Sequence, residues 1–316
     1  MNSTGLMVVT GGAGFIGSHL VEALVREGFS VRVLDNLAGG RRENLAAVEG
    51  RFEWLEGDAA DFEVCREAAR GAECVFHLAA IPSVPRSIME PRPSYSSGPT
   101  ATFNMLEAAR LAGVRRFILA ASSSAYGDTP SLPKREDMLP RPLSPYAAGK
   151  LAGEAYVLAY AQSMGLDGAS LRYFNIFGPR QDPSSPYSGV ISRFTMMMTQ
   201  GQRPVIHGNG GQTRDFTYVA NAVAANLEAL RSPAPLNGAV FNVGTGRRIS
   251  LLDLVAALNA ILGTNLEPRF EPARAGDVRD SQACLARIQS ILGYRPAVDF
   301  EEGLRRTLDC VGTTGH

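Results

Sequence analysis

The first half of the chain alternates short apolar runs with stretches whose apolar residues recur at helical spacing. Residues 6–10 are apolar and end in glycines, which predicts a strand followed by a turn. Ile16, Leu20 and Leu24 then mark one face of a helix over residues 15–27. Further strand patterns lie at residues 31–35, 52–55, 74–78, 116–120 and 168–173. Strands that alternate with helices predict right-handed βαβ units, and therefore an α/β fold built on a doubly wound parallel sheet.

This alternation ends near residue 175. Residues 178–186 are rich in Gly, Pro and Ser, which is typical of an irregular loop. Beyond it the patterns predict helices over 190–199, 219–230 and 251–262, a strand over 239–243, and a glycine-rich, hairpin-like segment around 208–211. We therefore predict a large nucleotide-binding domain of residues 1–175 and 214–246. Residues 176–213 and 247–316 are expected to form a smaller, irregular domain over the strand ends, where open α/β sheets bind ligands.

Composition and charge mainly exclude other classes of protein. Of 316 residues, 45% are hydrophobic and 20% are charged, which is typical of a globular protein. The 31 Lys and Arg residues balance 31 Asp and Glu residues, so we expect no basic field that would hold nucleic acid. No run approaches the roughly 18 apolar residues of a membrane helix. The apolar stretch at residue 6 has no basic leader before it and no cleavage signal after it, which predicts a cytoplasmic location.

The four cysteines are Cys65, Cys74, Cys284 and Cys310. They are too few and too scattered for a disulfide scaffold, and no pair has the spacing of a zinc or redox site. We expect reduced, mostly packed thiols and no metal.

A glycine-rich turn follows the first predicted strand and opens the first predicted helix. Gly11, Gly14 and Gly17 are spaced so that backbone N–H groups and the helix dipole can hold a pyrophosphate, although glycines are common in this chain. Asp35 ends the second strand, where a carboxylate binds the adenosine ribose and favours NAD over NADP. Asp58, at the end of the third strand, is placed either to reach the adenine side or to close a turn.

Tyr146 and Lys150 lie four residues apart at the start of a predicted helix. Residues i and i+4 share a helix face, so the phenol and the ammonium are expected to point the same way. A compact ammonium can lie beneath a bound ribose and lower the pKa of a neighbouring phenol. Ser122 follows the strand over 116–120 and adds a hydroxyl that can relay a proton or hold a sugar hydroxyl.

Several segments occur along the chain in a recognisable order. They are the turn from Gly11 to Gly17, Asp35, His77-Leu78-Ala79-Ala80, Ser122-Ser123-Ser124-Ala125-Tyr126-Gly127, Ser144-Pro145-Tyr146-Ala147-Ala148-Gly149-Lys150, Leu171-Arg172-Tyr173-Phe174-Asn175 and Thr213-Arg214-Asp215-Phe216. Over essentially the whole chain they resemble the extended short-chain dehydrogenases, and most of all the NAD-dependent UDP-sugar 4-epimerases. The resemblance implies a Rossmann-like fold, bound NAD and an isomerase that inverts C4 of a UDP-sugar through a 4-keto sugar. It also implies that Tyr146 takes the proton of the C4 hydroxyl, that Lys150 holds the ribose and that Ser122 hydrogen-bonds the same hydroxyl.

The resemblance further implies the residues that surround the two ligands. Those implied for NAD are Gly11, Gly14, Phe15, Ile16, Gly17, Asp35, Asn36, Asp58, Ala59, Leu78, Ala79, Ala80, Tyr146, Lys150 and Tyr173. Those implied for the UDP-sugar are Arg86, Ser122, Ser123, Tyr146, Asn175, Val190, Arg214, Arg274, Asp277 and Ser281. One departure concerns NAD. Gly98-Pro99 and Ala101-Thr102 stand where the family often has Asn-Val and Gly-Thr, and an amide that would contact the cofactor is missing.

The identity of the sugar depends on a few pocket residues. Ser281 stands where the family limits the room beside the sugar C2 group, and a small serine predicts that N-acetylated sugars fit. UDP-glucuronate 4-epimerase is a close alternative, because it requires only a few donors near Arg86 or Ser123. Dehydratases and decarboxylases on this scaffold need a carboxylate beside the catalytic hydroxyl, where this chain has Ser123, Ser124 and Ala125. A non-catalytic NAD sensor is the remaining alternative, although a sensor has no need of a paired tyrosine and lysine.

The resembling family also implies a homodimer. The predicted helices that follow Thr102 and Tyr146 carry apolar positions that include Leu106, Ala109, Leu151 and Ala155. We expect these positions to form a symmetric interface, and burial inside one subunit is the alternative explanation.

Overall fold

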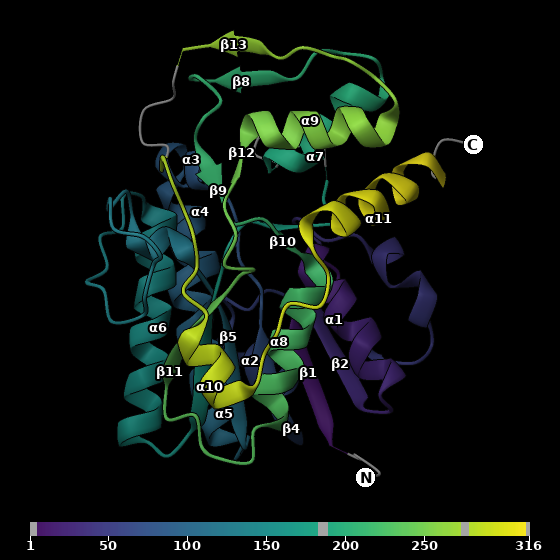
Figure 1. Cartoon of the computed structure of the whole chain (residues 1–316). Helices are drawn as coiled ribbons and strands as arrows, with labels where there is room; N and C mark the ends of the chain where they lie inside the picture. The colour runs from purple at the N-terminus through teal and green to yellow at the C-terminus, as the bar shows by residue number, and fades with distance from the viewer. Residues whose placement is uncertain (1–4, 183–188, 273–277, 314–316) are drawn as a thin grey trace.

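The computed structural model describes residues 5–182, 189–272 and 278–313 (Figure 1). Its centre is a seven-stranded sheet with the order β11-β6-β5-β4-β1-β2-β3, in which all neighbouring strands run parallel. The strands are β1 (Leu6–Thr10), β2 (Ser30–Asp35), β3 (Glu53–Glu56), β4 (Ala72–His77), β5 (Arg116–Ser122), β6 (Asp167–Tyr173) and β11 (Ala239–Val243). The predicted doubly wound sheet is confirmed. Its order reverses between β1 and β4, which opens a crevice at the strand ends.

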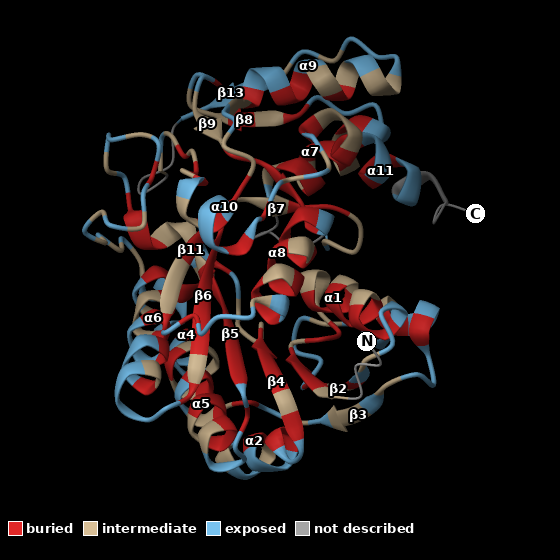
Figure 2. Ribbon diagram, turned by 60° about the horizontal axis from the view of Figure 1, so that its bottom comes forward, coloured by how far each residue is buried: buried red, intermediate tan, exposed pale blue. Residues whose placement is uncertain are grey.

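Helices cover both faces of this sheet, so its central strands are apolar without alternation. In β1, for example, Met7, Val8 and Val9 are fully buried. One face packs against α1 (Phe15–Arg26), α8 (Val219–Arg231) and α10 (Ala286–Leu292). The other packs against α2 (Phe62–Ala69), α5 (Ala101–Leu111) and α6 (Pro145–Ser163). Figure 2 shows buried strands between helices whose outer sides are exposed.

Short helices follow several strands at the carboxyl ends of the sheet, where open α/β sheets bind ligands. They are the 3₁₀ helices η1 (Arg42–Val48) and η3 (Ser123–Tyr126), the α-helices α3 (Val84–Met89) and α4 (Pro91–Tyr95), and the π-helical turn η2 (Ser96–Thr100). Two serines fix the starts of elements that matter for the site. The Ser144 hydroxyl accepts a hydrogen bond from the Ala147 N–H and caps α6, and Ser122 caps η3 in the same way.

A smaller C-terminal region, the cap, lies over the carboxyl ends of the strands (Figure 1). It comprises β7 (Ile176–Phe177), α7 (Val190–Thr199), β8 (Val205–His207), β9 (Thr213–Arg214), β10 (Thr217–Tyr218), β12 (Ile249–Ser250), α9 (Leu251–Leu262), β13 (Arg269–Glu271) and α11 (Phe300–Thr313). Its apolar core includes Phe177, Phe194, Leu254 and Phe300. The cap therefore folds around an apolar cluster separate from the two that cover the sheet.

The prediction of a hairpin-like segment around residues 208–211 is wrong. β8 pairs in parallel with β13, whereas β9 pairs antiparallel with β12. The glycines turn the chain between two different small sheets, because each strand finds a partner far along the sequence. A local turn signal cannot reveal such partners.

The chain returns to the sheet after the cap. Ile288 and Leu292 of α10, together with Tyr294, pack in the core beside β11 and α8. The domain boundaries drawn from the sequence stay a prediction, and within residues 247–316 the structure places this segment against the sheet. In the described part of the chain, no helix is long and apolar enough to span a membrane.

Candidate active site

One cavity of about 1700 Å³ extends along the carboxyl ends of the central strands and under the cap. Every residue implied for NAD lines it, from the glycine turn to Tyr173. So do Arg86, Ser122, Ser123, Asn175, Arg214 and Ser281 of the residues implied for the UDP-sugar. Val190 does not line it and packs beside the core of the cap, although its neighbours Gly189 and Ser192 do. Arg274 and Asp277 lie outside the described residues.

The glycine turn leaves an open cradle at the start of α1. Gly11 has a φ of +68°, and a Cβ on it would lie 2.8 Å from the backbone nitrogen of Ala79. A Cβ on Gly17 would lie 2.1 Å from the Gly11 carbonyl oxygen, so only glycine lets the helix approach the first strand this closely. Gly14 precedes α1 without a side-chain cap, which leaves the first N–H groups of the helix for a ligand. This cradle fits a pyrophosphate.

Two carboxylates lie at the end of the cavity where the adenosine is expected. Asp35 accepts hydrogen bonds from the backbone N–H groups of Ala13 (2.9 Å) and Leu37 (2.8 Å), which fixes it against the glycine turn. Burial raises the pKa of Asp35, and these two hydrogen bonds oppose the rise. Asp58 accepts hydrogen bonds from the Asn36 amide (3.1 Å) and the Ala60 N–H (2.8 Å). Asp58 therefore closes a turn and lines the cavity at once, so both of its predicted roles are compatible.

Tyr146, Lys150 and Ser122 meet at the other end of the crevice. Tyr146 and Lys150 lie on one face of α6, and both side chains line the cavity. The Ser122 hydroxyl hydrogen-bonds the Tyr146 phenol and accepts a 2.8 Å hydrogen bond from the Ser124 hydroxyl. The Lys150 ammonium donates a 2.6 Å hydrogen bond to the Ala120 carbonyl of β5. These contacts bring together the phenol, the ammonium and the hydroxyl that the sequence singled out.

The expected effect of Lys150 on the phenol is not present in this structure. Burial raises the pKa of Tyr146, and only the hydrogen bond with Ser122 opposes the rise. The Lys150 ammonium contributes no lowering, since it is directed to the Ala120 carbonyl. Burial also lowers the pKa of Lys150 to about 8, against the negative charge of Glu154. The ammonium therefore loses its proton at a lower pH than an ordinary lysine does.

The side of the cavity where the sugar is expected is built from the end of β6, the cap and the segment that begins at residue 278. The Asn175 amide donates to the Ser281 hydroxyl at 3.2 Å, which places the predicted C2 residue beside a predicted phosphate ligand. Arg214 donates to the carbonyl oxygens of Thr213 and Arg279, both at 2.9 Å. Arg86 lines the cavity while it pairs with Glu90 at 3.0 Å.

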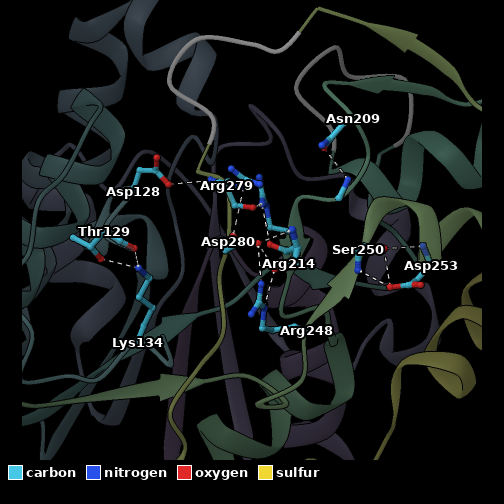
Figure 3. Close-up of polar contacts among 12 residues, drawn as sticks. Asp128, Thr129, Lys134, Asn209, Arg214, Arg248, Ser250, Asp253, Arg279 and Asp280 are labelled. Carbon is cyan, nitrogen blue, oxygen red and sulfur yellow. Dashed lines mark hydrogen bonds and ion pairs between the residues drawn. The ribbon is translucent and has the colours of Figure 1, made fainter. Parts of the chain in front are cut away.

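A polar network holds Arg214 in place, and much of it was missed in the sequence. Figure 3 shows Arg214, Arg248 and Arg279 gathered around Asp280. Asp280 accepts hydrogen bonds from the Thr213 hydroxyl (2.5 Å) and from Arg248 (3.1 Å). A serine, threonine or aspartate in a turn carries too general a signal to predict such a network.

Asp215, next to Arg214, is fully buried and joins three segments. Its carboxylate accepts hydrogen bonds from the backbone N–H groups of Thr245 (2.8 Å), Gly246 (2.9 Å) and Ala283 (3.0 Å). Burial raises its pKa, and these hydrogen bonds oppose the rise. Asp215 therefore has a structural role, and it fixes the backbone on which Arg214 and Ser281 stand.

A set of contacts between residues 179–182 and α1 was also not predicted from the sequence. Arg180 binds Glu22 of α1 and donates to the Ser18 hydroxyl at 3.2 Å. The His19 ring contacts the Pro179 carbonyl at 3.1 Å, and Arg41 pairs with Asp182 at 3.4 Å. These contacts tie residues 179–182 to the nucleotide-binding elements, and no spacing rule in the sequence connects positions about 160 residues apart.

The departure at Gly98-Pro99 falls in the π-helical turn η2. Pro99 has no N–H group, is buried, and packs its ring against Gly149, the residue before Lys150. This position therefore supports the catalytic helix and offers no backbone donor to a cofactor.

Among the described residues the cysteines form no disulfide, and Cys310 lines the cavity. Cys65 and Cys74 are buried. Among the described residues, no group of three or more His, Cys, Asp or Glu side chains is placed to hold a metal ion.

A dinucleotide turn that faces a tyrosine, lysine and serine set across one crevice defines an NAD-dependent enzyme of the short-chain dehydrogenase type. The chain belongs to the NAD dependent epimerase/dehydratase family, whose model it matches over residues 7–244. NAD is its cofactor, and the cradle, Asp35 and Lys150 are the groups that would hold it.

Individual relatives cover almost the whole chain. A UDP-glucose 4-epimerase of Mycolicibacterium smegmatis is 40% identical over 306 residues, which span 96% of this chain and 97% of that protein. A UDP-glucuronate 4-epimerase of Thermodesulfobacterium geofontis is 32% identical over 96% of this chain and 95% of that protein. Among solved structures, the UDP-N-acetylglucosamine 4-epimerase of Methanobrevibacter ruminantium superposes with a TM-score of 0.94, at 35% identity and with 99% of each chain covered.

Proposed function

We propose that this enzyme inverts the C4 configuration of a UDP-sugar through a 4-keto sugar. The observation that carries the proposal is the meeting of Tyr146, Lys150 and Ser122 in the same cavity as the glycine turn and Asp35. The relatives support it, because UDP-sugar 4-epimerases match this chain over nearly its full length.

Each of the three residues has a defined task in this reaction. Tyr146, as the phenolate, accepts the proton of the C4 hydroxyl and later returns one. Ser122 hydrogen-bonds the phenol in the structure and is placed to share that hydroxyl. Lys150 would hold the ribose of NAD, and its positive charge favours the phenolate only when the ammonium turns from the Ala120 carbonyl toward the phenol. NAD, when bound by the cradle, Asp35 and Lys150, would supply the hydride acceptor and donor for C4.

The sugar that we propose is a UDP-N-acetylhexosamine, with the plain UDP-hexose accepted as well. Ser281 is small, lines the cavity and is held by Asn175, so the space beside it accommodates an acetamido group. The substitution Ser281→Tyr should fill this space. We expect it to abolish turnover of UDP-N-acetylglucosamine and to spare UDP-glucose.

UDP-glucuronate is a second candidate, because of a buried cation. Lys134 is 1% exposed and lines the cavity, and in the described part of the chain its ammonium binds only Thr129 and forms no ion pair (Figure 3). Burial lowers its pKa, while the charges of Asp128 and Asp280 oppose this. A sugar carboxylate would neutralise such an ammonium.

The test is to incubate the purified enzyme separately with UDP-glucose, UDP-N-acetylglucosamine and UDP-glucuronate, and to read the C4 epimers by NMR. Tyr146→Phe should bind NAD and UDP-sugar but lose at least 100-fold in kcat, because a positioned general base contributes about 10²–10⁴-fold. If the wild type binds both ligands and inverts none of the sugars, the proposal fails and the sensor alternative gains.

We further propose a homodimer through the outer sides of α5 and α6, the two helices expected to form it. Of the four expected positions, Leu106 and Ala109 are fully buried inside the subunit and cannot form an interface, whereas Leu151 is half-buried and Ala155 is exposed. The burial of Leu106 and Ala109 completes the core between α5 and the sheet. On the outer sides of α5 and α6, Phe103 and Tyr156 are exposed and contact one another at 5.5 Å between ring centroids. Sedimentation at micromolar concentration of the wild type and of Phe103→Asp tests this surface.

A further inference from the structure

A buried carboxylate follows the two catalytic residues on the same helix face. Tyr146, Lys150 and Glu154 are spaced four residues apart on α6, so they form one row. The first two line the cavity, whereas Glu154 does not and is 4% exposed. The proposed reaction gives this buried charge no task. A buried carboxylate is costly without a partner.

That partner is Arg172 of β6, which is 3% exposed. Its guanidinium makes a two-pronged contact with Glu154, from Nε to Oε1 at 2.9 Å and from Nη2 to Oε2 at 2.7 Å. The same guanidinium lies over the Tyr126 ring, 4.6 Å from its centroid. Tyr126 in turn donates a 2.7 Å hydrogen bond to Asn242 of β11. Arg172 thus touches α6, which carries Tyr146 and Lys150, and η3, which follows Ser122.

Among the described residues, Glu154 of α6 and His77 of β4 interact electrostatically with Lys150. Tyr146 and Tyr173 line the same cavity, and Arg172 lies behind Glu154. Burial and the charge of Lys150 lower the pKa of His77 to about 3, and burial raises that of Tyr173 well above its ordinary value. Both are therefore neutral near neutral pH. In the described part of the chain, the charge of Glu154 raises the pKa of Lys150, against the larger effect of burial.

We propose that Glu154 and Arg172 act as a positioning pair, in which Glu154 keeps Lys150 charged and Arg172 holds the catalytic helix against the serine turn. The inference rests on the proposed function, because it assigns a role within that site. Neither residue lines the cavity. Their effect passes through Lys150 and through the distance between Tyr146 and Ser122.

The chain offers a matched control at the opposite end of the same sheet. Arg116, at the start of β5, is also 3% exposed and pairs with Asp167 of β6 at 2.8 Å. It also donates to the carbonyl oxygens of Ala229 and Ser232 at the end of α8, both at 2.8 Å. Arg116→Met therefore removes an equally buried arginine that lies far from the catalytic groups. It should destabilise the fold and leave the pH dependence unchanged.

The decisive variant replaces both charges, as Glu154→Leu with Arg172→Met. Exchange of a buried ion pair for apolar residues of similar volume is often neutral for folding, whereas removal of one partner is strongly destabilising. Glu154→Gln and Glu154→Asp accompany it as charge-removing and charge-keeping single variants. A purely structural pair predicts that the folded double variant behaves as the wild type.

Two readouts are followed in the NAD-loaded enzyme. The first is kcat against pH with the sugar that the wild type inverts. The second needs no turnover, because the chain has only two lysines, Lys134 and Lys150. Lysine labelled with ¹³C at the ε carbon gives two NMR signals, which Lys134→Arg assigns, and the pKa of Lys150 is read directly.

In the double variant and in Glu154→Gln we expect the pKa of Lys150 to fall by about one pH unit or more, the usual effect of one neighbouring charge. The basic limb of the kcat profile moves to lower pH by the same amount, because Lys150 must stay protonated. The KM for the sugar should change less than about twofold. Glu154→Asp should restore the wild-type midpoint.

A double variant that is folded and has the wild-type Lys150 midpoint and pH profile overturns the inference. So does Arg116→Met if it shifts the midpoint equally. A wild type that inverts no UDP-sugar while its Lys150 signal shifts in the Glu154 variants defeats the proposed function alone. The two failures are therefore distinguishable.

Discussion

The glycine turn permits two substitutions that separate helix packing from ligand approach. In Gly17→Ala the new Cβ would lie 2.1 Å from the Gly11 oxygen and 2.8 Å from the Gly12 Cα, both backbone atoms. Since real Cβ atoms stay beyond 3.0 Å, the helix and the turn must separate by about 1 Å. In Gly14→Ala the new Cβ meets only the Gly11 oxygen, at 3.1 Å. It otherwise projects into the cradle.

The two changes should therefore have different energetic signatures. Overpacking typically costs about 1–3 kcal/mol, and the better helix propensity of alanine returns up to about 1 kcal/mol. We expect Gly17→Ala to lower the free energy of unfolding by about 1–2 kcal/mol and to weaken NAD binding as well. Gly14→Ala should cost less than about 1 kcal/mol as a cap substitution. It should still weaken NAD binding at least tenfold, because the methyl group occupies the place of the pyrophosphate.

Urea unfolding of nucleotide-free protein, followed through the single tryptophan Trp54, measures the first quantity, and NAD titration measures the second. Gly98→Ala is the control, because Gly98 has an ordinary φ and no atom within 4 Å of the added Cβ. A Gly17→Ala protein as stable as the wild type, with unchanged NAD affinity, would refute the packing argument.

Two further predictions concern buried titratable groups. His77 has a pKa lowered to about 3 by burial and by Lys150, below its unfolded value of about 6.5. The unfolded chain therefore binds the proton first, so this group's contribution to stability is complete above about pH 6.5 and falls by up to about 1.4 kcal/mol per pH unit below it. Comparison of urea midpoints at pH 4.5 and 7.5 should show a smaller pH effect in His77→Phe than in the wild type, and an equal effect contradicts this assignment. In Asp215→Asn an amide NH₂ must face two former donors, which should cost about 2–4 kcal/mol of unfolding free energy. Asp253→Asn, at an exposed helix cap, should cost about 1 kcal/mol or less in the same assay, and equal losses would show that the buried carboxylate is not special.

Local patterns predicted the sheet and the central site because those patterns have local causes. Strand β1, the glycine turn and α1 occupy consecutive residues, and the pairing of Tyr146 with Lys150 follows from helix geometry alone. The register β5 to β6 then places Ser122 beside Tyr173, as parallel strand ends require. Residues at strand ends were therefore found from spacing and order.

The parts that the sequence did not reveal depend on distant partners. The partner of β8 is β13, and the charge of Arg180 is matched by Glu22 on the first helix. Residues 208–211 looked like a hairpin because glycine specifies a turn without specifying the pairing of the strands on either side of it. Leu106 and Ala109 looked like surface positions because an apolar residue buried by a sheet and one buried by another subunit have the same pattern. The pKa of Tyr146 was misjudged for a similar reason, since the direction of the Lys150 ammonium depends on a carbonyl of β5.

The return of the chain from the cap to the sheet restricts how the molecule can move. Asp215, between β9 and β10 of the cap, accepts hydrogen bonds from residues 245, 246 and 283, and α10 then packs beside β11. A rigid lid moves about one hinge, but here the cap and the sheet are connected at several separate places along the chain. A large opening of the cap would have to disrupt the contacts at all of these places together. We therefore expect ligands to exchange through small local displacements at the mouth of the cavity. A sugar that must turn over between two hydride transfers can then do so without escaping to water.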